Sequence, residues 1–484
     1  MARLLILGAG IAGHTAAMIA RRKLGKQHEV VVVTPNSMWN WIPSNIWVGV
    51  GKMSQEKVLF PLEPLYHKKG IIFHQALAVS LHPEGGQGHE RPFVTATSTK
   101  PGSAGDQEEI EYDFLINCTG PKLNFGATEG LGPKGNTVSV CTAGHAVEAA
   151  KQLQAAIARM KAGEKLCLVI GTGHGTCTCE GAAFEYTFNV DFTLREAGVR
   201  DMADLVYLTN EAQLGDFGVG GLVFTQQGFQ TTSKLWTESL YREREIHPIL
   251  GAHVSKVEPG VIHYEQIDGS LHELPFDFAM LIPPFRGADL KAYNAAGEDI
   301  SSEVFNPAGF MKVDANYSAG AYENWRASDW PKTYKAPGYD NVFAAGIAFA
   351  PPHQISRPMT SPNGTIITPA PPRTGMPSGI IAAAVVDTVV DRIKGEDRPA
   401  REAPMTQMGA ACVASAGASM FNGSAASMTM HPVVPDFEAY PETGRDLKGT
   451  SGEIGLAGHW MKRLLHTMFI YKAKGHPFWW LIPE

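Results

Sequence analysis

The stretch that decides the fold reads Val169-Ile-Gly-Thr-Gly-His-Gly-Thr-Cys-Thr-Cys-Glu-Gly-Ala-Ala-Phe-Glu185. It follows a short apolar run, Lys165 to Ile170, so strand, glycine turn and helix come in the order of a dinucleotide-binding unit. Thr176 occupies the position of the third glycine of that pattern, and the next strand ends near Glu211 with no acid cleanly at its tip. Cysteines stand where a nicotinamide cofactor would lie. We therefore interpret this turn as a scaffold for thiol chemistry, not as an NAD site.

Bulk composition narrows the class of protein. A chain of 484 residues is too long for one core and predicts two to three domains. The net charge of −7 argues against nucleic-acid binding, which normally needs a basic surface. Six cysteines are too few for a disulfide scaffold, and no spacing predicts a metal site. No apolar run reaches the length of a membrane-spanning helix, and Met1 leads directly into a strand, so we expect a soluble or peripherally attached intracellular protein.

A second glycine motif lies at the N-terminus. The apolar run Arg3 to Leu7 predicts a buried parallel strand, and His14 to Arg22 continues as a helix. Between them, Gly8 permits a tight turn, Gly10 lets the backbone approach a pyrophosphate, and Gly13 allows close packing of helix on strand. Strand, turn and helix in this order predict a bound dinucleotide cofactor.

Further cofactor contacts follow from the ends of neighbouring strands. The strand Glu29 to Val33 ends in Thr34-Pro35 where an acid usually holds the ribose, so we expect neutral groups to do so here. A strand over 71–78 should lend backbone groups at its end to an adenine. A helix from about Ser378 to Lys394 should begin at the negative edge of a reduced flavin. The remaining candidate contacts are Leu77, Ala78, Thr119, Gly120, Gly346 and Arg373.

One thiol is predicted to be reactive from its local sequence. Cys141 lies near the start of a helix over 146–161, where the helix dipole lowers a thiol pKa. His145 is either its proton partner or a helix cap, and the residues alone leave both interpretations open. Cys118 and Cys167 are interpreted as structural, and Cys177 as incidental. By its small neighbours alone, Cys412 is a core residue.

The tail predicts attachment to a membrane surface. A helix over 459–474 carries one apolar face, with basic residues away from the centre of that face and tryptophans following. Packing of this helix on the protein body is the alternative. The apolar face comprises Met461, Leu464, Leu465, Met468 and Tyr471, and the basic residues are Lys462, Arg463, Lys472 and Lys474.

The predicted fold class is α/β, with two Rossmann-like dinucleotide-binding domains in tandem and a C-terminal membrane-associating helical segment. Residues 1–160 form the first part of an FAD-binding domain, and 161–314 form a second Rossmann-like domain. Residues 315–395 return to the FAD-binding domain, and 396–484 form a C-terminal wrap and the amphipathic membrane segment. Residues 83–110 are expected to form an exposed hairpin or loop.

With these residues assembled, the chain resembles the sulfide:quinone oxidoreductases, flavoproteins of the two-dinucleotide-domain superfamily. Cys141 stands in a Cys-Thr-x-x-His segment similar to the family's, and Cys179 stands six residues before Glu185. Cys412 matches the third cysteine of the family, and Pro43 to Gly51 is also similar. An Asp216 in place of a histidine of some members, and Val413 in place of an aromatic residue, depart from the pattern.

The resemblance implies an enzyme that oxidises sulfide to polysulfide or sulfane sulfur and passes two electrons through FAD to a membrane quinone. A disulfide or polysulfide between Cys179 and Cys412 would receive the sulfide, with Glu185 as acid or base. Cys141 would relay sulfur with His145 as its proton partner. The quinone would bind among Phe285, Gly287 and Phe469. The cytoplasmic face of a prokaryotic inner membrane is the expected location, and self-association into a homo-oligomer is a further expectation.

Three alternatives stay open on the sequence. A type-II NADH:quinone oxidoreductase would share the fold but needs an intact second glycine motif. A flavoprotein sulfide dehydrogenase would pass electrons to a cytochrome partner. A non-catalytic flavoprotein relative would keep the fold without the reaction.

Overall fold

A computed structural model describes residues 1–86, 88–178, 180–226, 228–318, 320–417 and 419–484. The N-terminal motif belongs to a large sheet with strand order β21-β8-β1-β2-β5-β6-β7, to which β20 adds beside β5. The first five of these strands are parallel, and β6 and β7 extend the sheet as an antiparallel hairpin. The strands are β1 (Arg3–Leu7), β2 (Glu29–Thr34), β5 (Ile72–His82), β6 (Phe93–Ser98), β7 (Gln107–Glu111), β8 (Phe114–Asn117), β20 (Lys291–Ala292) and β21 (Val342–Ala344).

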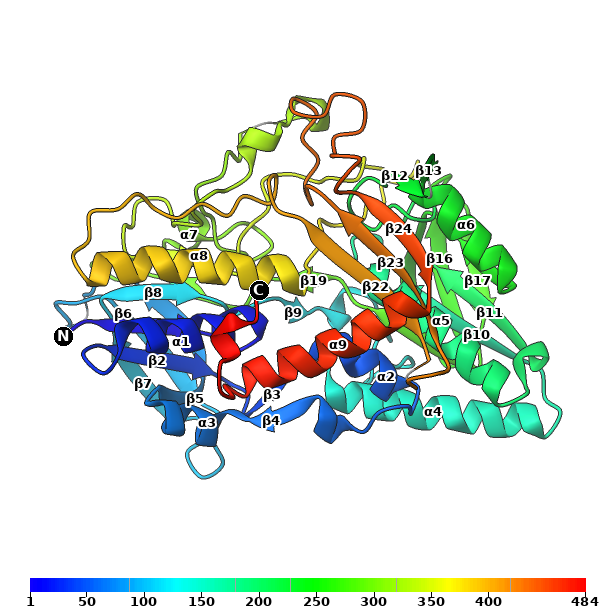
Figure 1. Cartoon of the computed structure of the whole chain (residues 1–484), viewed down its shortest axis with the longest axis horizontal. Coiled ribbons are helices and arrows are strands. Elements are labelled where there is room, and N and C mark those ends of the chain that lie inside the picture. The colour runs from blue at the N-terminus through cyan, green and yellow to red at the C-terminus, as the bar shows by residue number, and fades with distance from the viewer. Residues whose placement is uncertain (87, 179, 227, 319, 418) are drawn as a thin grey trace.

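Two helices that are distant in sequence pack together on this sheet. Helix α1 (Ile11–Leu24) follows the first glycine turn, and α8 (Gly375–Ile393) lies against it (Figure 1). The strands beneath carry continuous buried valine and leucine runs, as parallel strands covered on both faces require. The hairpin expected within 83–110 is confirmed by β6 and β7.

The opening stretch begins a second parallel sheet with the order β14-β11-β10-β18. Its strands are β10 (Leu166–Thr172), β11 (Ala203–Leu208), β14 (Ile246–Ile249) and β18 (Phe278–Ile282). The helices α4 (Ala143–Lys161), α5 (Glu180–Glu196) and α6 (Ser233–Glu243) belong to this half of the molecule (Figure 1). An antiparallel sheet of β15 (Ala252–Glu258), β16 (Val261–Gln266) and β17 (Leu271–Pro275) completes it. The α/β class with two Rossmann-like sheets is therefore confirmed.

The region expected to be an irregular wrap, 396–456, instead supplies three strands of a third sheet. The order is β13-β12-β24-β23-β22, with β12 (Val223–Gln226), β13 (Phe229–Thr232), β22 (Ala410–Ala416), β23 (Ser424–Met430) and β24 (Ser451–Gly455). Alanine and serine dominate β22 and β23, so the sequence shows little apolar alternation. These small side chains let the sheet fit between α5 on one side and α9 (Leu456–Ala473) on the other.

Helix α9 crosses from the third sheet to the first domain, and the chain then ends beside α1 and α8 (Figure 1). The buried His14 Nε2 lies 2.8 Å from the Ala473 carbonyl oxygen, and Lys472 pairs with Glu484 at 2.7 Å. No helix within the described ranges is both long and apolar enough to cross a bilayer. The shorter elements are α2 (Asn45–Gly49), α3 (Leu62–Lys69), α7 (Ser301–Val304), β3 (Met38–Asn40), β4 (Leu59–Pro61), β9 (Lys122–Leu123) and β19 (Phe285–Arg286).

Candidate functional site

The first glycine turn has the geometry of a pyrophosphate cradle. Gly8 has a φ of 92°, and a Cβ there would lie 2.3 Å from the Cys118 carbonyl oxygen. A Cβ on Gly13 would lie 2.0 Å from the Gly8 carbonyl oxygen. Gly10 has nothing within 4 Å of its Cβ position and begins α1 with no side-chain cap. The first N–H groups of α1 therefore face open space, which fits the phosphates of a dinucleotide.

One of the two strands expected to contact the cofactor ends at a different residue than predicted. Thr34 is buried at the carboxyl end of β2, and Pro35 is exposed. The strand expected to end at Ala78 instead runs on to His82, because β6 pairs with it from Ala76 onward. Leu77 and Ala78 are thus in mid-strand, and the prediction that they end the strand is wrong.

The remaining cofactor candidates line the junction of α1 and α8. Gly346 has a φ of 67°, and a Cβ there would lie 2.5 Å from the Ala12 side chain. Arg373 donates to the Ile347 carbonyl at 2.6 Å, and its guanidinium carbon lies 3.9 Å from the centre of the Phe310 ring. Both Gly346 and Arg373 line a narrow pocket at the start of α8. Thr119 and Gly120 follow β8, and the Asn117 side chain accepts the Thr119 N–H at 3.1 Å.

The C-terminal thiol comes to the start of α5. Cys412 lies in β22, and its Sγ is 3.4 Å from the Cβ position of Gly181. Gly181 follows Cys179 by two positions, while Cys179 itself lies outside the described residues, so its pairing with Cys412 stays a prediction. The sequence separates these two segments by more than 200 positions, and the packing of β22 on α5 unites them.

A buried ion pair borders Cys412. The Lys462 Nζ lies 2.9 Å from Glu185 Oε2, and both side chains are about nine-tenths buried. The other carboxylate oxygen accepts the Ser415 N–H at 3.1 Å and the Ser415 hydroxyl at 2.7 Å. Burial, and then the negative charge of Glu185, raise the pKa of the Cys412 thiol; the positive charge of Lys462 lowers it, and the net value is about 11.

Sequence reasoning missed the role of Lys462. We interpreted it as one of the basic residues flanking a membrane-facing stripe, but it points into the protein and also donates to the Val413 carbonyl at 3.2 Å. Its partner Glu185 is 277 positions away, so no local pattern could have found the pair. Ser415 was missed for the same reason.

The pair Cys141 and His145 departs from the prediction. Burial raises the pKa of the Cys141 thiol to about 11, and the Ser139 hydroxyl offsets this only in part, so the expected lowering by the helix start is wrong. The Thr142 side chain caps α4 by accepting the His145 N–H at 3.1 Å. The His145 ring packs edge-on against Phe125, and its Nδ1 has no partner among the described residues.

Cys177 is buried in the turn before α5. Its Sγ donates to the Ile282 carbonyl at 3.1 Å, and it is fully buried. Burial, Glu180 and, less strongly, Cys141 raise its pKa.

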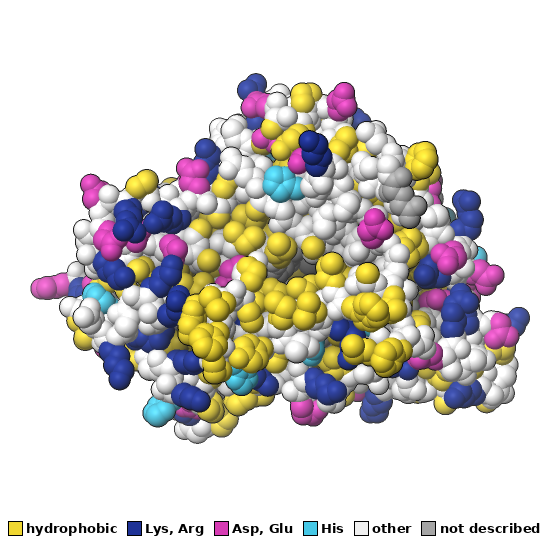
Figure 2. All heavy atoms as spheres, in the orientation of Figure 1, with side chains coloured by type: hydrophobic (Ala, Val, Ile, Leu, Met, Phe, Trp, Pro, Cys, Tyr) yellow, Lys and Arg dark blue, Asp and Glu magenta, His cyan; other side chains and the backbone are white. Residues whose placement is uncertain are grey.

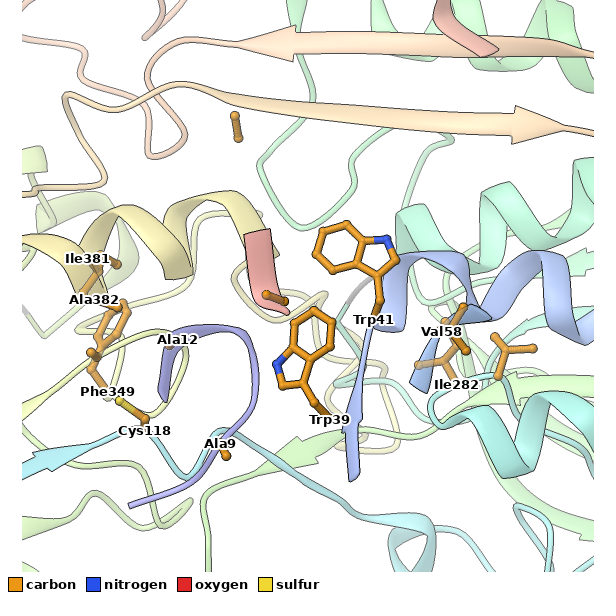
Figure 3. Packing of buried hydrophobic residues seen from close by; sticks show 14 of the residues in the cluster. Ala9, Ala12, Trp39, Trp41, Val58, Cys118, Ile282, Phe349, Ile381 and Ala382 are labelled. Carbon is orange, nitrogen blue, oxygen red and sulfur yellow. The ribbon is translucent and has the colours of Figure 1, made fainter. Parts of the chain in front are cut away.

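The residues expected at a quinone lie on separate elements. Phe285 in β19 pairs with Leu123 of β9, and a Cβ on Gly287 would lie 1.8 Å from the Gly309 carbonyl oxygen. Phe469 in α9 instead stacks on Trp41, with ring centres 5.0 Å apart. Trp41 stacks on Trp39 at 6.0 Å, and Figure 3 shows these two indoles between the α1 turn and the segment carrying Val58. Trp39, Trp41 and Phe469 thus form one aromatic stack.

The second glycine turn is covered by protein. The Thr368 N–H donates to the Gly175 carbonyl at 2.8 Å, and the Ala370 N–H donates to the Cys177 carbonyl at 2.9 Å. A Cβ on Gly175 would lie 2.3 Å from the Ile366 carbonyl oxygen, so the chain itself touches the turn where a pyrophosphate would approach. The segment 365–370 therefore occupies the face of the turn that a nicotinamide dinucleotide would need.

Fold and site together define the class of tandem dinucleotide-domain oxidoreductases with buried thiols. No family model matches the chain. The sulfide-quinone reductase of Aquifex aeolicus is 29% identical over 470 residues, covering 97% of this chain and 90% of that protein. The X-ray structure of the sulfide:quinone oxidoreductase from that bacterium superposes with a TM-score of 0.76 at 27% identity, covering 98% of this chain and 92% of that one. The chain is thus a relative of the sulfide:quinone oxidoreductases, and the predicted resemblance is confirmed.

More distant matches agree on the fold. The mitochondrial sulfide:quinone oxidoreductase of Schizosaccharomyces pombe is 22% identical over 364 residues, covering 71% of this chain and 68% of that protein. A structure of NDH2 from Plasmodium falciparum has a TM-score of 0.51 at 14% identity, covering 72% of this chain and 64% of that one. At that identity the likeness concerns the fold alone.

Proposed function

We propose that this protein oxidises sulfide to sulfane sulfur at its thiols and passes two electrons through FAD to a membrane quinone. The observation that carries this proposal is the position of Cys412 at the start of α5, beside the buried pair of Glu185 and Lys462. The negative charge of Glu185 favours the thiol form of Cys412, and the positive charge of Lys462 favours its thiolate form. The similarity to sulfide-quinone reductase over nearly the whole chain supports the same reaction.

The residues of the first domain fit FAD. Gly8, Gly10 and Gly13 would hold its pyrophosphate at the start of α1, and Gly346 would let α8 approach α1 beside it. FAD supplies the two-electron acceptor that links sulfur oxidation to quinone reduction. The stack of Trp39, Trp41 and Phe469 would exclude water from the side of this site that faces α9.

The cysteine chemistry can be described by atoms. A hydrosulfide ion attacks a disulfide sulfur, so one S–S bond forms and one breaks, leaving a persulfide and a thiolate. Lys462 would stabilise a thiolate at Cys412, and the negative charge of Glu185 would oppose it. The pairing of Cys179 with Cys412, and a sulfur relay through Cys141, belong to this proposal.

NADH is the rival electron donor. The contacts of Thr368 and Ala370 with the second glycine turn argue against it, because a dinucleotide would have to displace the segment 365–370. Asn210 further occupies the turn by donating to the Gly175 and Cys177 carbonyls at 3.1 and 3.2 Å.

The visible spectrum of the purified flavoprotein separates the two donors. Under anaerobic conditions, sulfide should bleach the flavin absorbance, NADH should leave it unchanged, and a quinone added after sulfide should restore it. Bleaching by NADH but not by sulfide would reverse the assignment.

Two cysteine variants test the thiol site within the same assay. Cys412→Ala should keep its FAD and lose bleaching by sulfide. Cys167→Ala is the matched control. Cys167 lies in β10 opposite Asp204 of β11, and its backbone N–H donates to the Asp277 side chain. Normal bleaching in Cys412→Ala would contradict the proposed role of its thiol.

We also propose that the protein attaches to a membrane surface through α9 and the residues that follow it. Figure 2 shows hydrophobic side chains gathered across one face, with Lys and Arg side chains around them. Exposed aromatic and aliphatic residues on a helix flanked by basic residues are typical of segments that bind at the interface of a bilayer. Binding there would bring the protein to the membrane that holds the quinone pool. The cytoplasmic side and self-association remain predictions. The exposed hydrophobic residues of α9, of the segment after it and of the turn before β23 are Met420, Phe421, Trp460, Met461, Leu464, Tyr471, Phe478, Trp480 and Leu481.

A further inference from the structure

A cluster of buried carboxyl groups lies at the start of α5. Glu180 is the first residue of α5, Glu211 follows β11, and Asp216 lies in the next turn. Gly218 borders two of them: its N–H donates to Asp216 at 3.0 Å, and its Cβ position is 3.5 Å from Glu180 Oε2. Tyr207 borders Glu180 and Glu211, because its hydroxyl lies 3.4 Å from the Glu180 carbonyl oxygen and 3.3 Å from Glu211 Oε2.

Among the described residues, nothing offsets the burial of the Glu180 carboxyl: only its own backbone and the nearby Asn210 side chain favour its charged form, and both act less strongly than burial. Its side chain is fully buried, and neither carboxyl oxygen has a hydrogen-bond partner among the described residues. Asn210 is the neighbouring amide, and its Oδ1 is also buried without a partner. Leaving such groups unpaired is costly, so a buried carboxyl without a partner indicates a role in chemistry rather than in stability.

Unlike Glu180, the other two carboxyls accept hydrogen bonds from their neighbours. Glu211 accepts the Phe217 N–H and the Thr209 hydroxyl, both at 2.9 Å. Asp216 accepts the Ser356 hydroxyl, and Asp216 is the one member of the set that reaches solvent. The order Glu180, Glu211, Asp216 therefore runs from the thiol side toward the surface.

Like charges this close together cannot all be ionised at neutral pH. Burial, and then the charge of Glu211, raise the pKa of Glu180 well above its ordinary range. Burial raises the pKa of Glu211 to about 7, and burial also raises that of Asp216. The titratable or charged groups facing the set are Cys177, Tyr207, Tyr241, Tyr322 and Arg445.

We propose that Glu180, Glu211 and Asp216 form a relay that removes protons from sulfur at the thiol site and delivers them to solvent beside Ser356. This inference rests on the proposed sulfide oxidation. Glu180 is the entry because it follows Cys179 directly in the chain and is next to Gly181, on which the Cys412 sulfur lies.

The proton balance is simple. Each hydrosulfide that enters a disulfide leaves a persulfide, –S–SH, which must lose its proton before its terminal sulfur can attack again. The set takes that proton: –S–SH and –COO⁻ become –S–S⁻ and –COOH, and no electrons move. Glu180 hands its own proton to Glu211 or Asp216 as it accepts the new one. Only the FAD and quinone of the proposed function are needed as oxidants.

The rate of flavin bleaching by sulfide between pH 6 and 8 tests the relay. Glu180→Gln keeps the shape of the side chain but cannot carry a proton, so bleaching at pH 7 should slow by about 100-fold with FAD content unchanged. The ratio of wild-type to variant rate should increase through pH 7, where the set ionises and can accept protons. Sulfide ionises equally for both proteins, so this ratio isolates the contribution of the protein.

A second readout needs no sulfide. Potentiometric titration of the oxidised holoprotein from pH 6 to 8 should release about one proton fewer in Glu211→Gln than in wild type. Glu265→Gln is the matched control, because Glu265 is a buried carboxylate of the second domain that Ser361, Thr365 and Asn363 already satisfy. It should leave both the bleaching rate and the titration unchanged.

The outcomes separate the relay from the reaction. If sulfide bleaches wild type and Glu180→Gln follows at the same rate at each pH, the relay is wrong and the proposed function stands. A uniform loss of rate with an unchanged ratio across pH also overturns the relay, because it indicates a structural effect. A wild-type flavin that sulfide does not bleach overturns the proposed function and the relay with it.

Discussion

The charges on either side of Cys412 should shift its reactivity in opposite directions. Glu185→Gln removes the negative charge that raises the Cys412 pKa, and Lys462→Met removes the positive charge that lowers it. A full charge within about 4–6 Å shifts a pKa by about 1–3 units, and one unit changes the thiolate fraction about tenfold when the thiol form dominates. We therefore expect Glu185→Gln to react about tenfold faster than wild type with iodoacetamide at pH 8, and Lys462→Met about tenfold slower.

The assay is alkylation of the reduced protein, followed by quantification of the Cys412 peptide by mass spectrometry. The Cys167 peptide is an internal control. Burial, Asp204 and Asp277 set the pKa of the Cys167 thiol, and neither Glu185 nor Lys462 is among the causes. The double variant Glu185→Gln/Lys462→Met should react at close to the wild-type rate, since both charges are gone.

Stability provides an independent check on the same pair. Removing one partner of a buried ion pair leaves an uncompensated charge and costs about 3–5 kcal/mol, whereas removing both costs much less. Lys462→Met should therefore lower the thermal midpoint more than the double variant does.

Equal or same-direction changes of Cys412 reactivity in the two single variants would refute the electrostatic reasoning.

The remaining predictions address the membrane face, the carboxyl cluster and the glycine turn. Leu464→Glu should weaken binding to anionic vesicles about tenfold in a sedimentation assay, while Phe229→Glu, at a more exposed position on β13, should not. The folded-state pKa of Glu211 is raised from 4.5 to about 7, so the stability that its protonated form contributes is lost as the pH rises through that window. Glu211→Gln cannot lose a proton, so the free energy of unfolding of this variant should fall by about 1–3 kcal/mol less than that of wild type. The measurement is the thermal midpoint between pH 5 and 8, which should fall less in the variant. Gly13→Val should yield protein with little bound FAD by absorbance, because the added side chain meets backbone 2.0 Å away, whereas Gly126→Ala in open space should bind FAD normally.

The local patterns in the sequence were sufficient where one element carries the whole signal. The run Arg3 to Leu7 and the glycines that follow it predicted β1, the turn and α1 because a parallel strand and a tight turn impose their residue types locally. Boundaries were less accurate where a neighbour extends an element, as β6 extends β5 to His82. The strands β22 and β23 were missed because alanine and serine give no apolar period.

The opening stretch shows where local information ends. The sequence by itself determined that Val169 to Glu185 is a strand, a glycine turn and a helix, and that Thr176 and the cysteines make it a poor nicotinamide site. Only the tertiary structure decided what covers this turn and what faces the helix start. The segment 365–370, the Cys412 thiol and Lys462 come from hundreds of residues away, and their charges and contacts act through distances in space that no spacing in the chain records.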